Sequence, residues 1–206
     1  MIEGDWTDLM DLSHRWAFAF DKEKHVGEPI LDKGQPIYIS FDFNRNPICC
    51  TIIQHLRNQI RVLETIKLGN SNIYELCKVI KAKYPRMSYF ITGDASGANG
   101  TAIVKDSLSY YLIIKKELNL TSHVFILPKS NPPLEENQAL VNALLQNYNI
   151  VIHKEHASAL IYDLQNVRML PNGTILKTNR QDPTQQSDAL DTFRYYCNVM
   201  HDDYIR

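Results

Sequence analysis

Apolar residues dominate the chain between residues 37 and 68, where three consecutive segments have the composition of strands. They read YISFDF, ICCTIIQHL and QIRVLETIKL, and short polar turns separate them at 44–47 and near 57–59. Parallel neighbours need a crossover of about a dozen residues, so such short connections join antiparallel strands. The sequence therefore predicts a three-stranded antiparallel meander.

The pattern then changes to an alternation of helices and strands. Asn72 and Glu75 form a capping box before a helix that ends at Pro85, and its apolar residues lie at helical spacing: Ile73, Leu76, Cys77 and Ile80. The strand SYFITGD follows, and a helix between two strands implies a right-handed crossover to a parallel neighbour. Further elements are expected as a helix at about 102–118, a strand at 123–127 and a helix at about 133–148.

The C-terminal part begins with NIVIHKEHASALIYDLQNV, which mixes strand and helix signals. RMLPNGTILK is typical of a hairpin turned at Asn172-Gly173. Asp182, Pro183 and Gln185 then match an N-cap, a first-turn proline and a capping-box partner, which predicts that the last helix begins there.

Length and composition set the domain count. With 206 residues, 44% hydrophobic and 22% charged, the chain suits one globular domain with an appendage. Residues 1–35 carry two tryptophans and two phenylalanines among many charges, followed by a loop rich in glycine and proline. We expect this segment to be a connector or arm that packs on this domain or on a neighbour, and residues 36–206 to form the domain itself.

Net charge and cysteine content argue against several classes of protein. A formal net charge of −1 does not indicate a dedicated polyanion binder, so any contact with nucleic acid must be local. The four cysteines form no CxxC pair and no zinc-ligand spacing, and are expected as small core residues in a reducing compartment. No apolar run approaches the ~18 residues of a membrane span, and no signal pattern opens the chain, so a cytosolic protein without membrane contact is predicted.

Acidic residues stand at informative places among these elements. Asp42 lies within an apolar strand, where an ionised carboxylate needs a counter-charge such as a metal ion; the alternative is a strand-end turn with Asn44 and Asn46. Asp94 ends the fourth strand, and Asp188 and Asp191 belong to the last helix. The order of strands and helices, with carboxylates at these positions, resembles the layout of the ribonuclease H fold, an α/β fold in which helices flank a mixed sheet.

The motifs that contain these residues support a closer resemblance. FDFNRNP, ITGDASG and SDALDTFRYY resemble, in this order, the three acidic motifs of the nuclease domain of the large terminase subunit of tailed bacteriophages. EGDWTDL followed by WAFAFD is similar to the segment that joins the terminase ATPase to its nuclease. LIYDLQNVRMLPNGTILK resembles the β-rich stretch before the final acidic helix, so the resemblance covers nearly the whole chain.

The resemblance implies a metal-dependent endonuclease that cuts concatemeric double-stranded viral DNA during packaging, at the prohead in the host cytoplasm. It implies the terminase ATPase domain, the small terminase subunit and the portal as partners. The cofactor would be a pair of Mg²⁺ or Mn²⁺ ions about 3.5–4 Å apart, since these ions prefer oxygen ligands. Asp42 would bridge both ions, and Asp94 and a carboxylate of the last helix would complete the site.

Asp188 and Asp191 compete for that last place. Both lie off the apolar stripe expected to face the sheet, which consists of Ala189, Leu190, Phe193, Tyr196, Cys197 and Met200. Asp188 is nearer to the stripe and to the helix N-terminus, where a negative charge is favoured. We therefore expect Asp188 as the direct ligand and Asp191 as a residue that orients water or holds Arg194; the alternative for Asp191 is an ordinary exposed helix position.

Other functions stay open at this stage. The chain has no GxxxxGK[ST] motif, and we expect a nuclease domain separated from its ATPase, with residues 1–35 as the former connector. The glycine-rich ASGANG is interpreted as a turn through which the backbone could approach DNA. A different ribonuclease H-like enzyme, such as a Holliday-junction resolvase, is one alternative. A non-catalytic interaction domain, with its acidic residues as turn and cap formers, is another.

Overall fold

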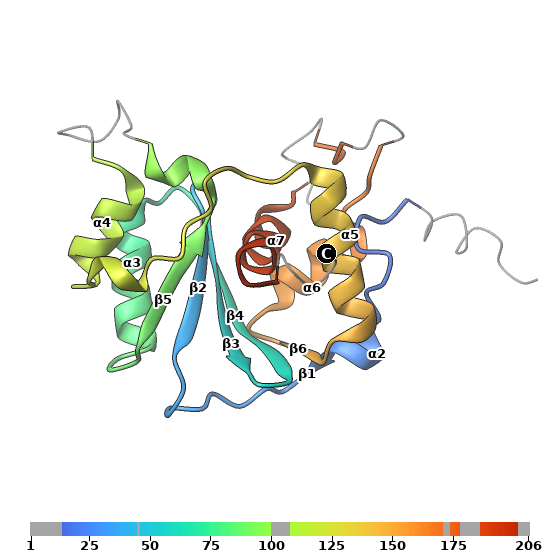
Figure 1. Cartoon of the computed structure of the whole chain (residues 1–206), viewed down its shortest axis with the longest axis horizontal. Helices are drawn as coiled ribbons and strands as arrows, with labels where there is room; N and C mark the ends of the chain where they lie inside the picture. The colour runs from blue at the N-terminus through green and yellow to red at the C-terminus, as the bar shows by residue number, and fades with distance from the viewer. Residues whose placement is uncertain (1–13, 45, 100–107, 171–173, 178–185, 202–206) are drawn as a thin grey trace, which may run out of the picture.

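The computed structural model of the chain describes residues 14–44, 46–99, 108–170, 174–177 and 186–201 (Figure 1). A six-stranded mixed sheet forms its centre, with the strand order β1-β6-β4-β3-β2-β5. The strands are β1 (Val26–Gly27), β2 (Ile37–Asp42), β3 (Ile48–Leu56), β4 (Gln59–Leu68), β5 (Tyr89–Gly93) and β6 (Ile150–His153).

Strands β2, β3 and β4 are antiparallel neighbours, which confirms the predicted meander. Strand β5 pairs with β2 in parallel and β6 pairs with β4 in parallel, as crossover connections through helices require. Most residues of β2 and β3 are buried without alternation, because helices cover both faces of the sheet.

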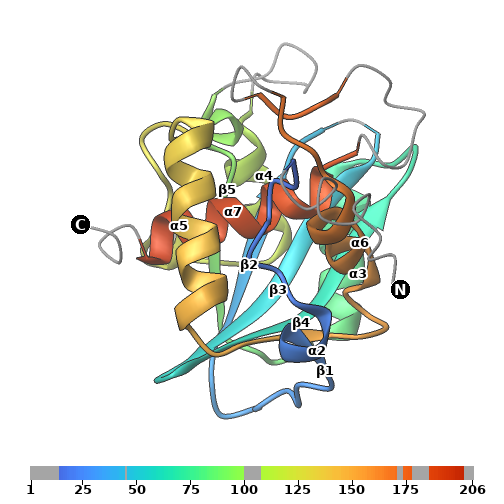
Figure 2. The ribbon, with the colours of Figure 1, turned by 90° about the vertical axis from the view of Figure 1, so that its right-hand side faces the viewer.

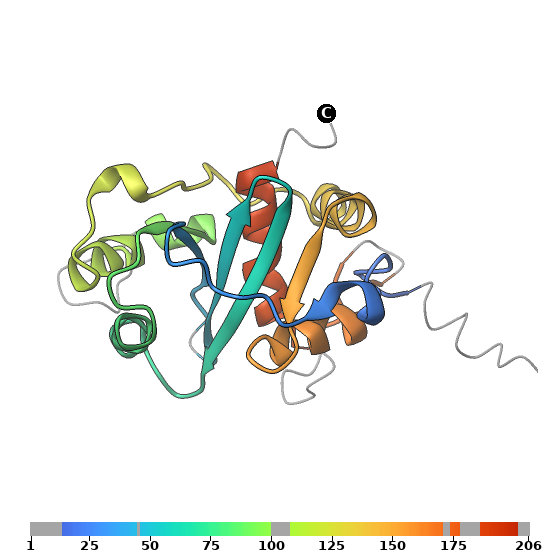
Figure 3. The ribbon, with the colours of Figure 1, turned by 90° about the horizontal axis from the view of Figure 1, so that it is seen from below.

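The helices divide between the two faces of the sheet. Figures 1 and 3 show α3 (Ile73–Lys83) and α4 (Tyr110–Glu117) on one side. On the other side lie α5 (Leu134–Asn147), α6 (Ser158–Asn166) and α7 (Asp188–His201). Each side has its own apolar core, with Phe41 and Ile80 in one and Leu144 and Phe193 in the other.

Several local predictions are confirmed. The Asn72 side chain accepts hydrogen bonds from the Tyr74 and Glu75 amides, at 3.0 and 3.1 Å, so α3 starts where its cap predicts. All four cysteines are buried and free, as expected of small core residues. In the described part of the chain, no helix is both long and apolar enough to cross a membrane.

The described part of the predicted arm packs on this domain. Trp16 is fully buried, and its amide donates to the Val167 carbonyl oxygen at 2.9 Å. The short helix α2 (Lys22–His25) follows, and His25 Nε2 lies 2.8 Å from the Leu145 carbonyl oxygen. Strand β1 then pairs with β6, so the sheet begins before residue 36 and the boundary predicted there is not a break in packing. Residues 1–13 lie outside the described residues.

The helix predicted at about 102–118 is present with a later start, and the strand predicted at 123–127 is wrong. The helix expected at about 102–118 begins at Tyr110, because Ser109 has an extended backbone and its hydroxyl caps the Leu112 amide at 3.3 Å; residues 102–107 are outside the described ranges. The strand expected at 123–127 is instead a 3-10 turn and a single parallel bridge from Phe125 to Ile91. The Phe125 amide bonds to Ser122 within the turn, which leaves only the Ile126 amide to pair with β5.

The predicted hairpin and the start of the last helix are described only in part. Met169 and Ile175 form an antiparallel bridge on either side of the predicted turn, whose Asn172-Gly173 pair is not among the described residues. Helix α7 begins at Asp188, since Gln186 and Ser187 are not helical, so the prediction of a continuous helix from Pro183 is wrong. The capping group that replaces the predicted one comes from another helix, as described below.

One glycine of the glycine-rich segment is required by packing. Gly97 lies in the 3-10 turn η1 (Ala95–Ala98), and a Cβ atom there would stand 2.1 Å from the Phe43 ring. That ring is itself stacked on Tyr110, with centroids 4.6 Å apart. Gly97 therefore makes room for the aromatic residue next to Asp42.

Replacement of Gly97 by alanine should destabilise the protein by about 1–3 kcal/mol, because the buried Phe43 ring must move. Urea denaturation of the variant measures this cost. The control is Gly69→Ala, where the nearest atom to the new Cβ would lie at an ordinary 3.5 Å. Equal stability of the two variants would show that Phe43 yields without cost.

Candidate metal centre

Asp42 and Asp94 lie side by side because their strands are parallel neighbours. Asp42 is the last residue of β2 and only 4% exposed. Asp94 directly follows β5, and its amide donates to the Phe41 carbonyl oxygen at 3.0 Å. Gly93, the residue before Asp94, has φ 143°, and a Cβ atom there would lie 2.3 Å from the Phe41 carbonyl oxygen. Glycine at this position lets the two strand ends approach each other.

The N-terminus of α7 brings Asp188 to the same end of the sheet. The side-chain amide of Asn44 links two of these carboxylates. Its Nδ2 donates to Asp42 Oδ2 at 2.7 Å and to Asp188 Oδ1 at 3.0 Å. The sequence suggested Asn44 only as a partner of Asp42 in a turn, and that contact is present. Its second bond, to a residue 144 positions away, joins strand β2 to helix α7.

Lys67 lies near the Asp188 oxygen that Asn44 does not contact. Asp42, Cys49 and Lys67 are register partners on β2, β3 and β4, so their side chains leave the same face of the sheet. The Lys67 ammonium lies 3.5 Å from Asp188 Oδ2 and donates to Gln186 Oε1 at 3.2 Å. No sequence pattern marked Lys67; only the register of the meander places it at the site.

Asp94 has a partly local set of partners. Its Oδ1 accepts from the Ser96 amide and from Asn131 Nδ2, both at 2.8 Å. The bond to Ser96 is the turn-forming role that the non-catalytic alternative assigns to such residues. Asn131 also accepts from the Ala95 amide at 3.0 Å, and so holds the segment after β5 in place. Within the described residues, no hydrogen bond reaches Asp94 Oδ2.

Asp191 is neutralised by its own partners. Its Oδ1 accepts from Arg194 Nε at 2.7 Å, and its Oδ2 accepts from Lys177 Nζ at 2.9 Å and Ser187 Oγ at 3.0 Å. Burial works to raise the pKa of Asp191, but the Arg194 and Lys177 charges outweigh it and lower the pKa. The contact with Arg194 that we expected is present. At 3% exposure, the alternative of an ordinary exposed helix position is wrong.

The prediction that α7 buries only one stripe is also wrong. Every residue from 188 to 197 is buried, because α7 lies between the sheet and the helices α5 and α6. Figure 2 shows α7 passing behind α5, with the strands beyond it. Thr192 on α7 bonds to Thr51 on β3, so even polar positions face the interior.

Asp163 on α6 is a further buried carboxylate that the sequence did not suggest. Its Oδ2 accepts from the Ala189 and Leu190 amides at 3.0 and 3.1 Å, in the first turn of α7. Burial raises the pKa of Asp163 to about 7, and Asp188 and Asp191 add to this effect. The only local signal is an aspartate in the otherwise apolar helical segment LIYDL.

The carboxylates form one electrostatic cluster. Burial raises the pKa of Asp42 to about 8, and repulsion from Asp191, Asp188 and Asp94 contributes to this rise, against a smaller opposite effect of Lys177. A divalent cation would relieve this repulsion, and its preferred ligands are carboxylate oxygens. In the present side-chain positions, no three acidic, histidine or cysteine groups of the described residues are close enough to hold an ion together. The donor set thus fits Mg²⁺ or Mn²⁺ in chemistry, and the Asn44 amide connects the carboxylates of Asp42 and Asp188.

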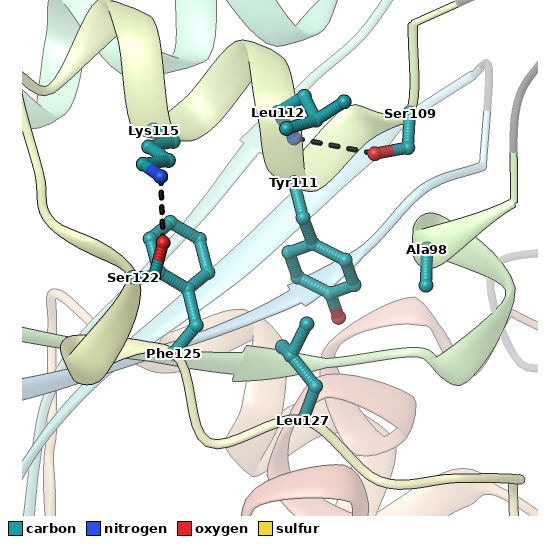
Figure 4. A pocket seen from close by; sticks show the side chains of 8 residues that line it. All are labelled: Ala98, Ser109, Tyr111, Leu112, Lys115, Ser122, Phe125 and Leu127. Carbon is teal, nitrogen blue, oxygen red and sulfur yellow. Dashed lines mark hydrogen bonds between the residues drawn. The ribbon is translucent and has the colours of Figure 1, made fainter.

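A separate, mainly apolar pocket of about 240 Å³ lies beside this cluster, between α4 and the 122–127 segment (Figure 4). The Tyr111 side chain points toward Leu127 in it, and Lys115 donates to Ser122 at 2.6 Å. The Tyr111 hydroxyl donates to the Asp94 carbonyl oxygen at 2.8 Å, and burial raises the pKa of Tyr111, which keeps this donor protonated. The pocket wall therefore helps to fix the end of β5.

The β2–β4 meander, the parallel strand β5 and the acidic residues at one end of the sheet give this chain a ribonuclease H-like fold. Comparison with solved structures is more specific. The P22 large terminase nuclease domain superposes with a TM-score of 0.61 and 14% identity over 91% of this chain and 92% of that domain. The nuclease of the large terminase from thermophilic phage G20c, with bound magnesium, gives a TM-score of 0.58 and 12% identity over 90% and 97%.

A longer large terminase, from another thermophilic bacteriophage, gives a TM-score of 0.65 and 11% identity over 91% of this chain. The chain spans 45% of the length of that protein. No protein-family model matches the sequence, and no curated protein matches it. The chain thus has the fold of the nuclease domain of large terminases, as its motifs suggested.

Proposed function

We propose that this chain is a metal-dependent endonuclease domain that cleaves double-stranded viral DNA during genome packaging. The observation that carries the proposal is the convergence of Asp42, Asp94 and Asp188, from two strand ends and a helix N-terminus, at one end of the sheet. The fold shared with terminase nucleases, one of them with bound magnesium, supports it. A non-catalytic interaction domain would have no comparable reason to gather carboxylates from distant segments.

In this proposal the carboxylates of Asp42, Asp94 and Asp188 would hold Mg²⁺ or Mn²⁺, as a pair of ions if the chemistry is that of the two-metal nucleases. Bound ions of this kind activate a water molecule and stabilise the charges on the attacking and leaving oxygens of the phosphodiester. Metal ligation would use the Asp42 oxygens, one of which now accepts from Asn44, and would need the carboxylate deprotonated, so the raised pKa of Asp42 should make metal binding depend on pH.

The remaining residues orient the ligands. Lys67 and Asn44 fix the Asp188 carboxylate, and Asn131 fixes that of Asp94. Asp191, with both oxygens engaged, keeps Arg194 and Lys177 in place instead of ligating an ion directly. As partners we propose a terminase ATPase domain, the small terminase subunit and the portal, by analogy with the shared fold.

Cleavage of plasmid DNA tests the proposal. The chain should linearise plasmid with Mg²⁺ or Mn²⁺ and lose all activity with EDTA, because its ligands are carboxylates. The control is Glu75→Gln, since Glu75 is exposed and forms an ion pair with Lys78 on the same helix α3, and this variant should cut like wild type. Activity with Zn²⁺ alone would contradict the carboxylate cluster.

The same assay separates the proposal from a junction resolvase. Linear duplex and a four-way junction of equal length are offered together, each with its own label. A terminase-type nuclease cuts the duplex arms of both substrates alike. Cleavage restricted to the branch point of the junction would instead favour the resolvase.

A further inference from the structure

Asp163 is unusual among the buried residues of α6. It is 2% exposed, and the other buried side chains of the helix are the apolar Leu160, Ile161 and Leu164. A carboxylate at such a place costs free energy unless it accepts hydrogen bonds. Asp163 accepts two, both from backbone amides of α7, at positions 26 and 27 residues further along the chain.

These two amides need an acceptor from outside their own helix. The first turn of any helix leaves its N–H groups without partners, and a preceding serine or aspartate normally supplies an oxygen. Here the Ser187 hydroxyl donates to Asp191, and the Gln186 side-chain oxygen accepts from Lys67. The cap of α7 therefore comes from α6, through Asp163.

The place of this cap determines the place of Asp188. The capped amides belong to Ala189 and Leu190, the two residues directly after Asp188. Fixing them fixes the backbone from which Asp188 reaches Asn44 and Lys67. Outer partners of this kind commonly change metal affinity about 10- to 100-fold.

The contact with α7 is made by the side-chain oxygen of Asp163. Burial and the neighbouring Asp188 and Asp191 carboxylates disfavour a negative charge at this position, while the Leu190 amide and Lys67 favour it. An uncharged side-chain oxygen accepts the same two hydrogen bonds. We infer that Asp163 is a positioning residue of the metal centre, whose side-chain oxygen holds the first turn of α7 and thereby sets the position of Asp188; its effect on metal binding rests on the proposed function.

Two substitutions separate oxygen placement from charge. Asp163→Asn keeps an acceptor oxygen at the same place and removes the charge, whereas Asp163→Glu keeps the charge and displaces the oxygen by one methylene. The control is Tyr162→Phe on the exposed side of the same helix. Circular dichroism and melting curves verify the fold. If the Glu variant does not fold, Asp163→Ser is used instead, because the serine side chain is too short to reach the Ala189 and Leu190 amides.

The first measurement is hydrogen exchange of the Ala189 and Leu190 amides in the metal-free full chain. Protection should persist in Asp163→Asn and fall at least about tenfold in Asp163→Glu or Asp163→Ser. The second is the Mn²⁺ dissociation constant from calorimetry, which should change less than about threefold in the Asn variant and rise at least about tenfold in the others.

Other results overturn the inference. Loss of protection and affinity in Asp163→Asn, with both kept in Asp163→Glu, would show that charge is what matters. Unchanged values in all variants would show that α7 is held without Asp163. Wild-type protein that binds no Mn²⁺ would refute the proposed function, while the exchange data would still decide whether Asp163 caps α7.

Discussion

Asp42→Asn should abolish DNA cleavage and stabilise the metal-free protein. Asparagine has the shape of aspartate and can still accept the Asn44 hydrogen bond, but it cannot serve as an anionic ligand shared by two ions. It also needs no proton, whereas burial and three neighbouring carboxylates force Asp42 to take one up when the chain folds at neutral pH. The expected gain at pH 7 is on the order of 2 kcal/mol, or about 4–8 °C in melting temperature for a chain of this size.

The gain should depend on pH in a defined direction. The pKa of Asp42 is raised from 3.8 to about 8, so its carboxyl stabilises the folded state fully below pH 3.8, and this contribution is lost as the pH rises to about 8. The difference in melting temperature between Asp42→Asn and wild type, measured in EDTA, should therefore widen from pH 4 to pH 8. Glu75→Gln is the control. If the Asn variant unfolds where metal-free wild type is folded, Asp42 has a structural role.

Substitutions at Asp188 and Asp191 should differ in their effects on DNA cleavage and on stability. Asp188→Ala should abolish cleavage at any metal concentration and leave the fold intact, because its polar partners are the Asn44 amide and a lysine 3.5 Å away. Asp191→Ala should destabilise the protein by about 3–5 kcal/mol, because the buried Arg194 loses its ion pair. Cleavage by this variant should fall but recover in part with excess Mn²⁺.

A double variant distinguishes the structural part of the Asp191 effect. Asp191→Ala combined with Arg194→Met removes both charges and should regain most of the lost stability, as measured by urea denaturation. The reverse pattern, with Asp188→Ala destabilised and rescued by Mn²⁺, would overturn the assignment. Total loss of cleavage in both single variants with intact folds would make both residues direct ligands.

Of the ligands that the sequence predicted, Asp42 and Asp94 are placed by the order of the strands, whereas Asp188 is placed by the last helix. Asp42 and Asp94 end parallel neighbours, and the meander with its crossover helix follows from short turns and the Asn72 cap. These signals are local, because connection length and capping chemistry involve only residues near each other in sequence.

The remainder of the site depends on distant segments. Lys67 enters through strand register, and the capped first turn of α7 depends on Asp163 of another helix. The capping signature at 182–185 predicted an earlier start, but α7 begins at Asp188, six residues after Asp182. Residues 182–185 themselves are outside the described part of the chain. An apolar stripe likewise could not show that α7 is covered on its second side by α5 and α6.

The packing of the N-terminal segment defines how mechanical load would enter the domain. The His14 carbonyl oxygen and the Trp16 amide bond to Met169 and Val167, directly after α6. Tension applied at residue 14 would shear these bonds and reach α6 before strand β2. Since α6 carries the oxygen that holds the first turn of α7, a pull at residue 14 would be transmitted through α6 to the turn that follows Asp188. The three proposed ligands thus differ in how they connect to the N-terminal segment. Asp188 is linked to it through α6, whereas Asp42 and Asp94 lie at the ends of the paired strands β2 and β5.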